Sequence, residues 1–329
     1  IRHSSLVLRY SFLMSSEFEV VRDPLWNNIR IDAEAVRVLD SEPLQRLRYV
    51  RQLGHAFLVY PGSTHTRFEH ALGTYHLTRR TLGLLRDRGE LDHVDKEELS
   101  LVQLAALLHD VGHYPFSHAL EEAGLPSHEK LAASHLRHEE LAAIFDDSGI
   151  GNAENRISDL ISGESTSPLQ GLVSGSLDLD KIEYLTRDAW MCGVPYGTVD
   201  VDRLVHSLTL LTLESGRKTV GVHEKGVSAL ESLLFARYQM YRNVYWHHAV
   251  RSATAMFKRL VRGALVRQEL DPDWIAHSTD DALMEALERL PDAPLATRLK
   301  RRRLYKRVLD IPASELPLGA GDWIASSPD

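Results

Sequence analysis

Hydrophobic and polar residues recur along most of this chain with the 3.6-residue period of an amphipathic α-helix. Alternation typical of strands is confined to two expected hairpins, one formed by 17–23 and 26–32 and the other by 208–214 and 218–224. The pattern therefore predicts a mostly all-α helical bundle with minor β hairpins. The segments with helical periodicity are 32–52, 69–88, 97–110, 128–145, 177–190, 200–208, 225–265, 278–290 and a basic stretch at 294–309.

The chain has 329 residues, enough for one large domain with an appendage. "MSSE" at Met14 resembles a natural start, so we expect residues 1–13 to be an upstream extension. The main helical core is expected over 14–265. A helical appendage is expected over 266–329, and one interpretation of it is a truncated regulatory lobe. The expected linkers are "FDDSGIGNAEN" and the stretch near Asp271 and Pro272.

Composition narrows the class of protein. Hydrophobic residues make up 43% of the chain, which is enough for a sizeable core. The formal charge of -8 argues against a nucleic-acid-coating protein, although a local basic cluster can still bind a small polyanion. No apolar run reaches the roughly 18 residues of a membrane span. Cys192 is the single cysteine, which excludes an internal disulfide and favours a reducing, cytoplasmic location.

The segment "LLHDVGHYPFSH" concentrates residues that can bind a metal ion. His109 and Asp110 end an apolar helix, and Gly112 and Pro115 prevent that helix from continuing. Imidazole and carboxylate together suit a divalent ion such as Mn, Fe, Co, Ni, Zn or Mg. Taken alone, a His-Asp pair of this kind is more often structural than ligating, by roughly four to one.

Two later segments add a polar stripe each. Asp180, Tyr184 and Asp188 are spaced at i, i+4 and i+8, which places them on one helix face. Arg237, Tyr241 and Tyr245 have the same spacing in a later helix. Tyrosine stripes usually pack in a core, but an arginine on the same face is difficult to bury without an anion.

The motifs together resemble the HD-domain metal-dependent phosphohydrolases. The segments "LQRLRYVRQLG", "YPGSTHTRFEHALG", "LLHDVGHYPFSH", "DLDKIEYLTRD" and "RYQMYRNVYWHHAV" occur in the order typical of the deoxynucleoside triphosphate triphosphohydrolase branch, and the resemblance extends from about Val20 to Val308. It implies an HD fold with one divalent metal per active site, and a second ion that arrives with substrate is compatible with it. The implied metal ligands are His70, His109, Asp110 and Asp180.

The resemblance also implies catalytic and substrate-binding residues. His113 and His128 match histidines at the reacting phosphate, with His128 suited to protonate the leaving oxygen and Glu121 to orient it. Glu121 stands where the family has an aspartate, which alters that contact. His118 has the alternative of simple packing. The implied substrate contacts are Arg67, Lys181 and Arg237 for phosphates, Tyr184 and Asp188 for the sugar, Gln52, Leu53 and Tyr245 around its 2′ position, and Tyr241 near the base.

A regulatory nucleotide is a further implication of the resemblance. The basic stretch "LKRRRLYKRV" is by itself most often a solvated helix face. The family nevertheless predicts a GTP or dGTP activator that assembles a homo-oligomer, dimer or tetramer. The residues that match its binding site are Asp40, Gln45, Arg48, Arg203, Lys225, Arg302 and Lys306.

The leading prediction is hydrolysis of a deoxynucleoside triphosphate to deoxynucleoside and inorganic triphosphate. Two alternatives stay open. One is an HD phosphohydrolase that acts on a nucleoside monophosphate, a cyclic nucleotide or a modified nucleotide, which needs fewer cationic side chains. The other is a nucleotide-sensing module that binds without turnover. Neither a membrane nor a nucleic acid is expected as a partner.

Overall fold

The computed structural model describes residues 18–291, 294–308, 311, 315 and 319, and the expected extension 1–13 lies outside them. The helices and helical turns are α1 (Ala33–Asp40), α2 (Glu42–Arg46), η1 (Leu47–Tyr49), η2 (Gly54–Leu58), α3 (Arg67–Asp87), α4 (Lys96–Leu108), η3 (Ser117–Ala119), α5 (His128–Leu136), α6 (Glu139–Ser148), α7 (Ala153–Ser162), α8 (Gln170–Val173), α9 (Leu179–Cys192), η4 (Pro195–Gly197), α10 (Val201–Ser207), η5 (Glu224–Gly226), α11 (Val227–Met240), η6 (Tyr241–Tyr245), α12 (His248–Val266), α13 (Pro272–His277), α14 (Asp280–Glu288) and α15 (Pro294–Lys300).

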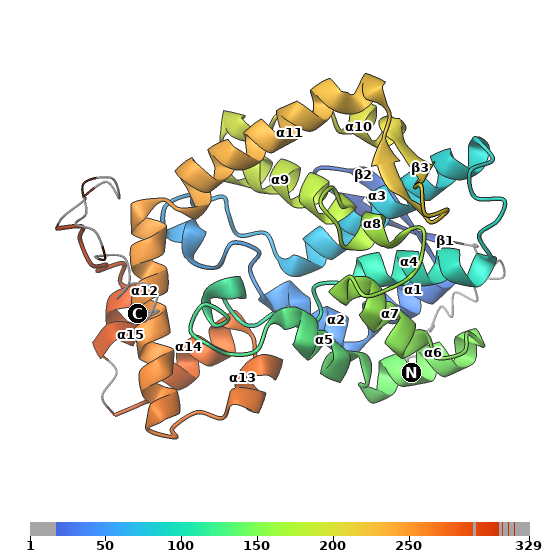
Figure 1. Cartoon of the computed structure of the whole chain (residues 1–329). Coiled ribbons are helices and arrows are strands. Elements are labelled where there is room, and N and C mark those ends of the chain that lie inside the picture. Colours follow the sequence, from blue (N-terminus) through green and yellow to red (C-terminus); the bar gives the residue numbers. More distant parts are fainter. Residues whose placement is uncertain (1–17, 292–293, 309–310, 312–314, 316–318, 320–329) are drawn as a thin grey trace, which may run out of the picture.

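Both expected hairpins are confirmed. Strand β1 (Phe18–Asp23) pairs antiparallel with β2 (Asn27–Asp32), and β3 (Leu208–Thr212) pairs antiparallel with β4 (Lys218–Val222). In β2 the buried Ile29 and Ile31 alternate with exposed polar residues, so one face of the hairpin packs on the helices. The mostly helical class predicted from the sequence is therefore confirmed (Figure 1).

Three predicted long helices are divided, and the prediction was wrong at each division. Segment 32–52 breaks at Ser41, whose backbone is extended, and Pro43 then favours a new start. Segment 128–145 breaks at His138, and α6 begins after it. Segment 225–265 passes through the π-turn η6 and stops at His247, where a side-chain cap starts α12.

Two further segments differ from the prediction. The basic stretch 294–309 is helical only through Lys300, because Arg302 adopts a left-handed backbone with φ of 52°. The expected linker "FDDSGIGNAEN" is mostly helix, since α6 extends through Ser148 and α7 begins at Ala153. Only the short segment between them is irregular. The second expected linker lies between α12 and α13.

The described helices bury two hydrophobic cores. The larger core surrounds α3, which lies against α4 and α9. The smaller core joins α12, α13, α14 and α15 to the segment 114–120, through Tyr114, Phe116 and Leu120. Figure 1 shows α12–α15 gathered at one end of the molecule, with the 114–120 segment beside them. The loop after α4 therefore lies between the two cores.

Candidate functional site

Helix α3 brings His70 to the centre of the molecule. A capping box starts this helix: Thr66 is the N-cap, and the Glu69 carboxylate accepts a hydrogen bond from the Thr66 backbone N–H at 2.6 Å. This defined start places Arg67 and His70 on the first turn, and both side chains are buried. This capping-box motif, Thr66 followed three residues later by Glu69, can be recognised in the sequence.

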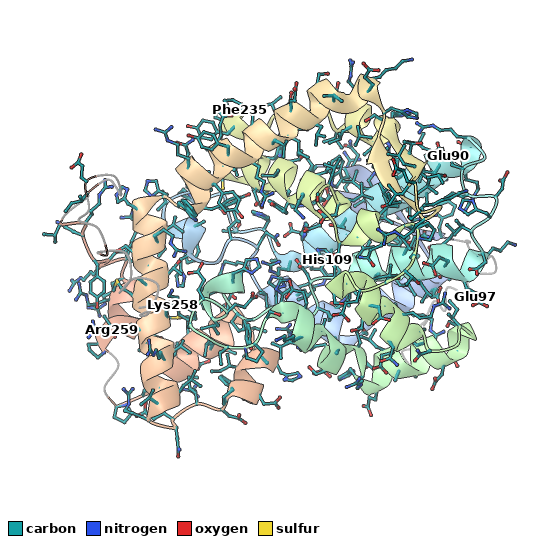
Figure 2. All side chains as sticks on the ribbon, in the orientation of Figure 1. Glu90, Glu97, His109, Phe235, Lys258 and Arg259 are labelled. Atoms are coloured by element: carbon teal, nitrogen blue, oxygen red, sulfur yellow. The ribbon has the colours of Figure 1, made fainter. Side chains whose placement is uncertain are left out.

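The end of α4 supplies His109 and Asp110. Helix α4 stops at Leu108 with His109 as its C-cap, and the following residues turn away. Gly112 lies so close to α5 that an added Cβ would stand 2.2 Å from the His128 backbone oxygen. Glycine is therefore required where the loop passes α5. Figure 2 places His109 well inside the molecule, whereas Glu97 and Arg259 lie at its periphery.

Four side chains from α3, α4 and α9 meet at one point. His70 Nε2 lies 3.1 Å from His109 Nε2 and 2.9 Å from Asp180 Oδ1. His109 Nε2 lies 3.4 Å from Asp110 Oδ1 and 3.5 Å from Asp180 Oδ1. The structure thus brings together all four residues that the sequence singled out as metal ligands. His70, His109 and Asp110 also form a group with ligand atoms within 4.8 Å of one another.

The outer nitrogens of both imidazoles are occupied. His109 Nδ1 donates to the Ala106 carbonyl oxygen at 2.9 Å, and His70 Nδ1 donates to Glu183 Oε2 at 2.5 Å. When each ring is neutral and protonated at Nδ1, its lone pair is at Nε2 and points into the cluster. Two such lone pairs 3.1 Å apart repel each other unless a positive charge lies between them. This donor set fits a divalent cation.

The electrostatics of the cluster favour a cation as well. Burial lowers the pKa of His70, but hydrogen bonds to Asp180 and Glu183 outweigh it and raise that pKa to about 10. Burial opposes ionisation of Asp110, yet the charge of Arg67 holds the pKa of that carboxyl far below its usual range. The pKa of Asp180 is likewise well below its usual range, since His109 and His70 outweigh its burial. The carboxylates are therefore ionised at neutral pH.

Glu183 is a site residue that the sequence analysis missed. Its buried carboxylate accepts hydrogen bonds from His70 Nδ1, from Arg187 Nε at 2.7 Å and from Trp26 Nε1 at 2.9 Å. Gly73 makes room for it, because an added Cβ there would stand 2.0 Å from Glu183 Oε1. The available signal was the i, i+3 spacing of Asp180 and Glu183 on one helix.

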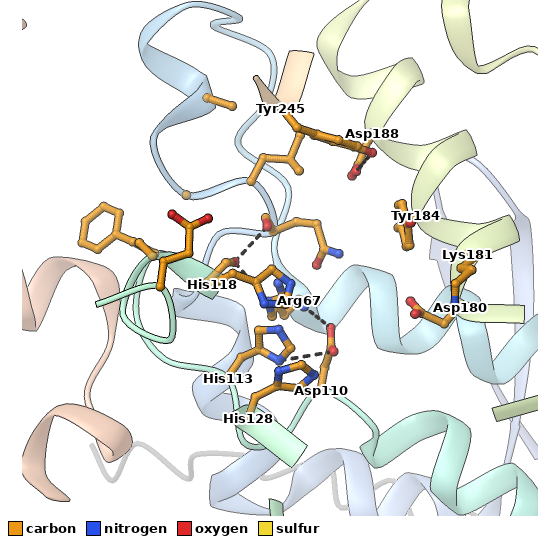
Figure 3. A pocket seen from close by; sticks show the side chains of 18 of the residues that line it. Arg67, Asp110, His113, His118, His128, Asp180, Lys181, Tyr184, Asp188 and Tyr245 are labelled. Atoms are coloured by element: carbon orange, nitrogen blue, oxygen red, sulfur yellow. Dashed lines mark hydrogen bonds and ion pairs between the residues drawn. The ribbon is translucent and has the colours of Figure 1, made fainter. Parts of the chain in front are cut away.

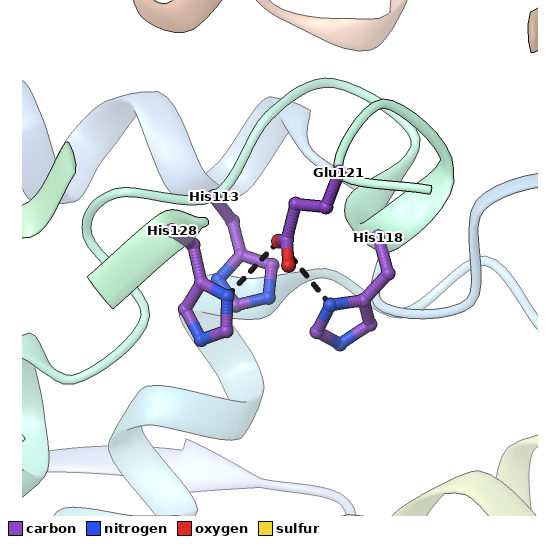
Figure 4. A group of neighbouring side chains, drawn as sticks. All are labelled: His113, His118, Glu121 and His128. Atoms are coloured by element: carbon purple, nitrogen blue, oxygen red, sulfur yellow. Dashed lines mark hydrogen bonds and ion pairs between the residues drawn. The ribbon is translucent and has the colours of Figure 1, made fainter. Parts of the chain in front are cut away.

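A second histidine cluster lies beside the first. His118 Nδ1 and His128 Nδ1 lie 3.3 Å and 2.9 Å from Glu121 Oε1, and the His113 and His128 ring centres are 3.7 Å apart (Figure 4). Burial opposes ionisation of Glu121, but the hydrogen bonds from His118 and His128 lower its pKa to about 2. The contact between Glu121 and His128 exists although the family's aspartate is replaced by the longer glutamate.

His113 differs from its neighbours because it has no hydrogen-bond partner. Its side chain is 1% exposed, and neither ring nitrogen has a partner among the described residues. Its Nδ1 lies 3.3 Å from Asp110 Oδ1 but is not aligned for a hydrogen bond. Burial and the charge of Arg67 lower the pKa of His113 well below its usual value, so the ring is neutral. An unpartnered buried ring next to a cavity is available to a bound molecule.

The segment that carries these histidines has an unusual backbone. Phe116 and Ser117 are consecutive residues with φ of 59° and 60°. For residues other than glycine this left-handed region costs roughly 1–2 kcal/mol each, so surrounding contacts must hold it. Ser117 Oγ lies within hydrogen-bond distance of the Gln52 backbone oxygen, at 2.8 Å, and accepts from Arg67 Nε at 3.2 Å.

Both clusters line one cavity of about 560 Å³, in the size range of small-molecule sites (Figure 3). His70 and Glu121 are not among its lining residues. The cavity is lined by most of the residues predicted for metal binding, substrate binding and catalysis: Gln52, Leu53, Arg67, His109, Asp110, His113, His118, His128, Asp180, Lys181, Tyr184, Asp188, Tyr241 and Tyr245.

The three cationic side chains predicted to bind phosphate differ in their position relative to the cavity. Arg67 Nη1 donates to Asp110 Oδ2, and Lys181 Nζ donates to Asp178 Oδ2 at 2.6 Å. Both line the cavity, and both already have carboxylate partners. Arg237 does not line it; its guanidinium lies 5.6 Å from the centre of the Tyr241 ring. A polyanion would therefore have to compete with carboxylates for two of these cations.

The predicted sugar contacts form a buried network. Asp188 Oδ1 lies 2.8 Å from His65 Nε2, and Asp188 Oδ2 accepts from Tyr245 Oη at 2.7 Å. His65 was missed in the sequence, where it stands five residues before His70. The Asp188 carboxylate is held between two side chains and is fixed in orientation before any ligand arrives.

The residues predicted for a regulatory nucleotide lie in three separate places within one chain. Arg48 Nε donates to Gln45 Oε1 at 2.8 Å, close to the exposed Asp40 at the end of α1. Arg203 donates to the Lys225 backbone oxygen, and these two residues line a different hollow. Arg302 and Lys306 are exposed after α15, where Arg302 Nε donates to the Leu58 backbone oxygen. One chain does not assemble these groups into one site.

Two sequence profiles match the chain. That of the HD domain covers residues 67–182, and that of the HD-associated region covers 199–324. A crystal structure of a hypothetical protein from Aquifex aeolicus superimposes with a TM-score of 0.77 and 34% identity over 89% of this chain and 78% of that one.

Among similar sequences, an uncharacterized protein of Methanocaldococcus jannaschii is 39% identical over 88% of this chain and 59% of its own length. The uncharacterized protein YwfO of Bacillus subtilis is 30% identical over 76% of this chain and 56% of its own. The deoxynucleoside triphosphate triphosphohydrolase SAMHD1 of Gallus gallus is 27% identical over 94% and 60%. The chain thus spans somewhat more than half the length of these relatives.

In the part of the chain that the structure describes, no helix combines the length and hydrophobicity needed to cross a bilayer. The HD profile covers residues 67–182, so it contains His70, His109, Asp110 and Asp180. The chain belongs to the family of HD-domain proteins, with an HD domain followed by an HD-associated region.

Proposed function

We propose that this protein hydrolyses a deoxynucleoside triphosphate to deoxynucleoside and inorganic triphosphate. The observation that carries the proposal is a cavity in which a cluster suited to a divalent cation lies next to an imidazole–carboxylate pair, His128 and Glu121. The name of the SAMHD1 relative supports the choice of substrate.

In this proposal His70, His109, Asp110 and Asp180 hold one divalent ion, with Mn, Mg, Fe, Co, Ni and Zn as the candidates. When bound, such an ion polarises a phosphoryl oxygen and lowers the pKa of a water molecule. Glu183 and the Ala106 carbonyl fix the tautomers of the two imidazoles, which keeps both Nε2 lone pairs directed inward.

The chain's own residues divide the remaining work. The oxygen of a water molecule forms a bond to the α-phosphorus and loses one proton to solvent. The bond from that phosphorus to the 5′ oxygen breaks, and its electron pair stays with the 5′ oxygen. His128 Nε2 gives a proton to the leaving 5′ oxygen, and Glu121 at Nδ1 stabilises the imidazolium that must form beforehand. His113, neutral and without a hydrogen-bond partner among the described residues, donates a hydrogen bond from its ring N–H to an oxygen of the reacting phosphate. His118 is more exposed and contacts Glu121 from the solvent side.

Arg67 and Lys181 bind the outgoing triphosphate, and Arg237 adds charge from the rim beside Tyr241. Tyr184 and Asp188 contact the deoxyribose, while Gln52, Leu53 and Tyr245 limit the room for a 2′-hydroxyl. We further propose a homo-oligomer in which subunits combine the three separate groups of regulatory residues into a site for GTP or dGTP. In such an assembly, groups from different chains meet at an interface.

A second candidate is a phosphohydrolase that acts on a less charged nucleotide, such as a monophosphate or a cyclic or modified nucleotide. The observation that favours it is that Arg67 and Lys181 both have carboxylate partners, which leaves less positive charge for a triphosphate. A nucleotide-binding module without turnover is the third outcome of the same experiment.

The test is one panel of substrates with the purified protein loaded with Mn, Mg or Co. All four dNTPs, the matching rNTPs and monophosphates are supplied with and without GTP or dGTP. Release of intact triphosphate from dNTPs supports the proposal. Phosphate released only from monophosphates supports the second candidate, and binding without any product supports the sensing module.

A further inference from the structure

The N-terminus of α14 contains a buried carboxylate that none of the functions above explains. Asp280 is 1% exposed and lies in the HD-associated region, outside the HD profile and outside the cavity lining. Its Oδ1 accepts from the Phe116 backbone N–H at 2.8 Å. Its Oδ2 accepts from the Arg51 backbone N–H and from Arg51 Nη1, both at 3.1 Å.

The two backbone groups that Asp280 binds belong to two adjoining walls of the cavity. Arg51 precedes Gln52 and Leu53, and Phe116 precedes Ser117 and His118. One carboxylate therefore joins segment 51–54 to segment 113–118, although all four lining residues lie more than 150 positions earlier in the chain.

Segments 51–54 and 113–118 are in direct, close contact. Gly54 has φ of 48°, and an added Cβ there would stand 2.9 Å from the Phe116 backbone oxygen. Ser117 Oγ lies 2.9 Å from the Arg51 backbone oxygen and 2.8 Å from that of Gln52. Phe116 and Ser117 keep a left-handed backbone that only surrounding contacts can hold. Asp280 supplies one of those contacts from outside the site.

Arg46 reinforces the junction from the other side. Its Nη2 donates to the backbone oxygens of Val111 and His113, at 2.7 and 2.9 Å, and its Nη1 donates to the Ser278 oxygen at 3.0 Å. Ser278 stands two residues before Asp280. The HD-associated region is thus attached to both ends of the histidine-bearing loop, through the buried Asp280 and the half-buried Arg46.

We propose that Asp280 is a positioning residue, through which the HD-associated region fixes the relative position of the two adjoining cavity walls that carry Gln52 and His113. It touches no substrate and acts through the backbone of Arg51 and Phe116. The inference about the walls follows from the contacts alone, whereas its consequence for turnover rests on the proposed function.

The test uses the full chain loaded with metal and compares Asp280→Asn with Asp281→Asn. An asparagine amide presents N–H groups to the Arg51 or Phe116 N–H, so one contact becomes a repulsion between donors. Asp281 is the matched control because it is the next residue of α14, its side chain is 88% exposed, and its nearest basic partner, Arg51 Nη2, lies 3.8 Å away.

Hydrogen–deuterium exchange, metal content and steady-state turnover are measured on each protein. In Asp280→Asn we expect exchange in segments 49–55 and 111–120 to be about 10-fold faster, with α3 and α9 unchanged. Metal content stays at the wild-type value. The kcat of any hydrolysis found in the panel falls by roughly 30-fold, with KM changed less than about threefold, because the walls are displaced and the substrate charges still find their partners.

Three results would overturn the proposal: unchanged exchange in both segments, equally faster exchange in α3 and α9, or the same effect in Asp281→Asn. If Asp280→Asn does not fold, Arg51→Met removes one of the three contacts and leaves the backbone N–H in place. That variant is expected to accelerate exchange in the same two segments by about threefold, and no change there contradicts the positioning role. A wild-type protein without turnover would reject the proposed function while the exchange contrast still decides the role of Asp280.

Discussion

The two histidine clusters, which meet at Asp110, use the same side chain in different ways. In the first, every outer nitrogen is occupied: His109 by the Ala106 carbonyl and His70 by Glu183. In the second, neither nitrogen of His113 has a hydrogen-bond partner among the residues that the structure describes, and His118 is 57% exposed. Fixed tautomers suit a cation that stays, whereas a free, neutral imidazole suits a group that forms and loses hydrogen bonds during a reaction.

The difference follows from burial and local charge. Acidic groups surround His70 and raise its pKa to about 10 despite its burial. Cationic neighbours surround His113 and, together with burial, depress its pKa. Asp110 contacts both His70 and His113. The charged form is therefore favoured for His70 and the neutral form for His113, although the two rings lie on either side of one carboxylate. Neighbouring titratable groups whose pKa values are shifted in opposite directions are typical of sites that combine binding with proton transfer.

The largest expected effect removes the first cluster. Asp180→Ala should abolish both metal content and turnover, because the remaining donors leave the ion incompletely coordinated. Elemental analysis and the substrate panel measure the two losses. Asp202→Ala, an exposed carboxylate paired with Arg80, is the control and should behave as wild type. A variant that keeps its ion while turnover disappears would contradict the assignment of Asp180 as a ligand.

Changes in the second cluster should separate chemistry from metal binding. His128→Ala is expected to lower kcat by about 10²–10⁴-fold with the ion retained, as for the loss of a general acid. Glu121→Gln keeps an acceptor but loses the charge, so its effect should be about 10-fold. Metal loss in His128→Ala would mean that the two clusters act as one.

Arg67 contacts Asp110 of the first cluster and Ser117, which precedes His118 of the second cluster. Arg67→Ala should lower kcat/KM for triphosphates by roughly 30-fold while leaving monophosphate binding nearly unchanged, because a cationic partner of the polyanion is lost. Arg67→Lys should restore part of the activity. Loss of the ion in Arg67→Ala would show that the arginine serves the metal site and not the substrate.

Replacing a histidine by leucine should change the free energy of unfolding in opposite directions in the two clusters. In metal-free protein, His70→Leu is expected to destabilise the fold by about 2 kcal/mol, since the buried Glu183 carboxylate loses a donor. His113→Leu should stabilise it by about 1 kcal/mol, since two unpartnered nitrogens are removed. Urea unfolding of both variants measures the contrast, and equal signs would remove this distinction between the clusters.

The pH dependence of His113 gives the smallest and most specific effect. Its folded-state pKa lies below that of the unfolded chain, so the unfolded state takes up the proton first as pH falls. The stability of metal-free wild type should therefore fall below about pH 6.5, by up to ~1.4 kcal/mol per pH unit from this group. His113→Leu should lose stability less steeply between pH 6.5 and 5. Identical slopes in unfolding experiments would show that His113 is protonated in the folded state.

The sequence determined the class of the fold and the identity of the clustered residues. The 3.6-residue period predicts helices, and alternating residues predict both hairpins, because these patterns reflect local burial. Its errors occurred where backbone changes inside a periodic segment, as at Ser41, His138 and η6. The hydrophobic residues keep the 3.6-residue period on both sides of such a break, so the pattern alone does not show where the helix ends.

Only the tertiary structure decided which nitrogen of each histidine is free, that Glu183 and His65 complete the site, and that Asp280 joins its two walls. These contacts join residues far apart in the chain, and their energies depend on burial and on the charges that the fold brings near. Local sequence encodes the helix that carries a side chain. The partner of that side chain is determined by the packing of distant segments against each other, and no single segment encodes that packing.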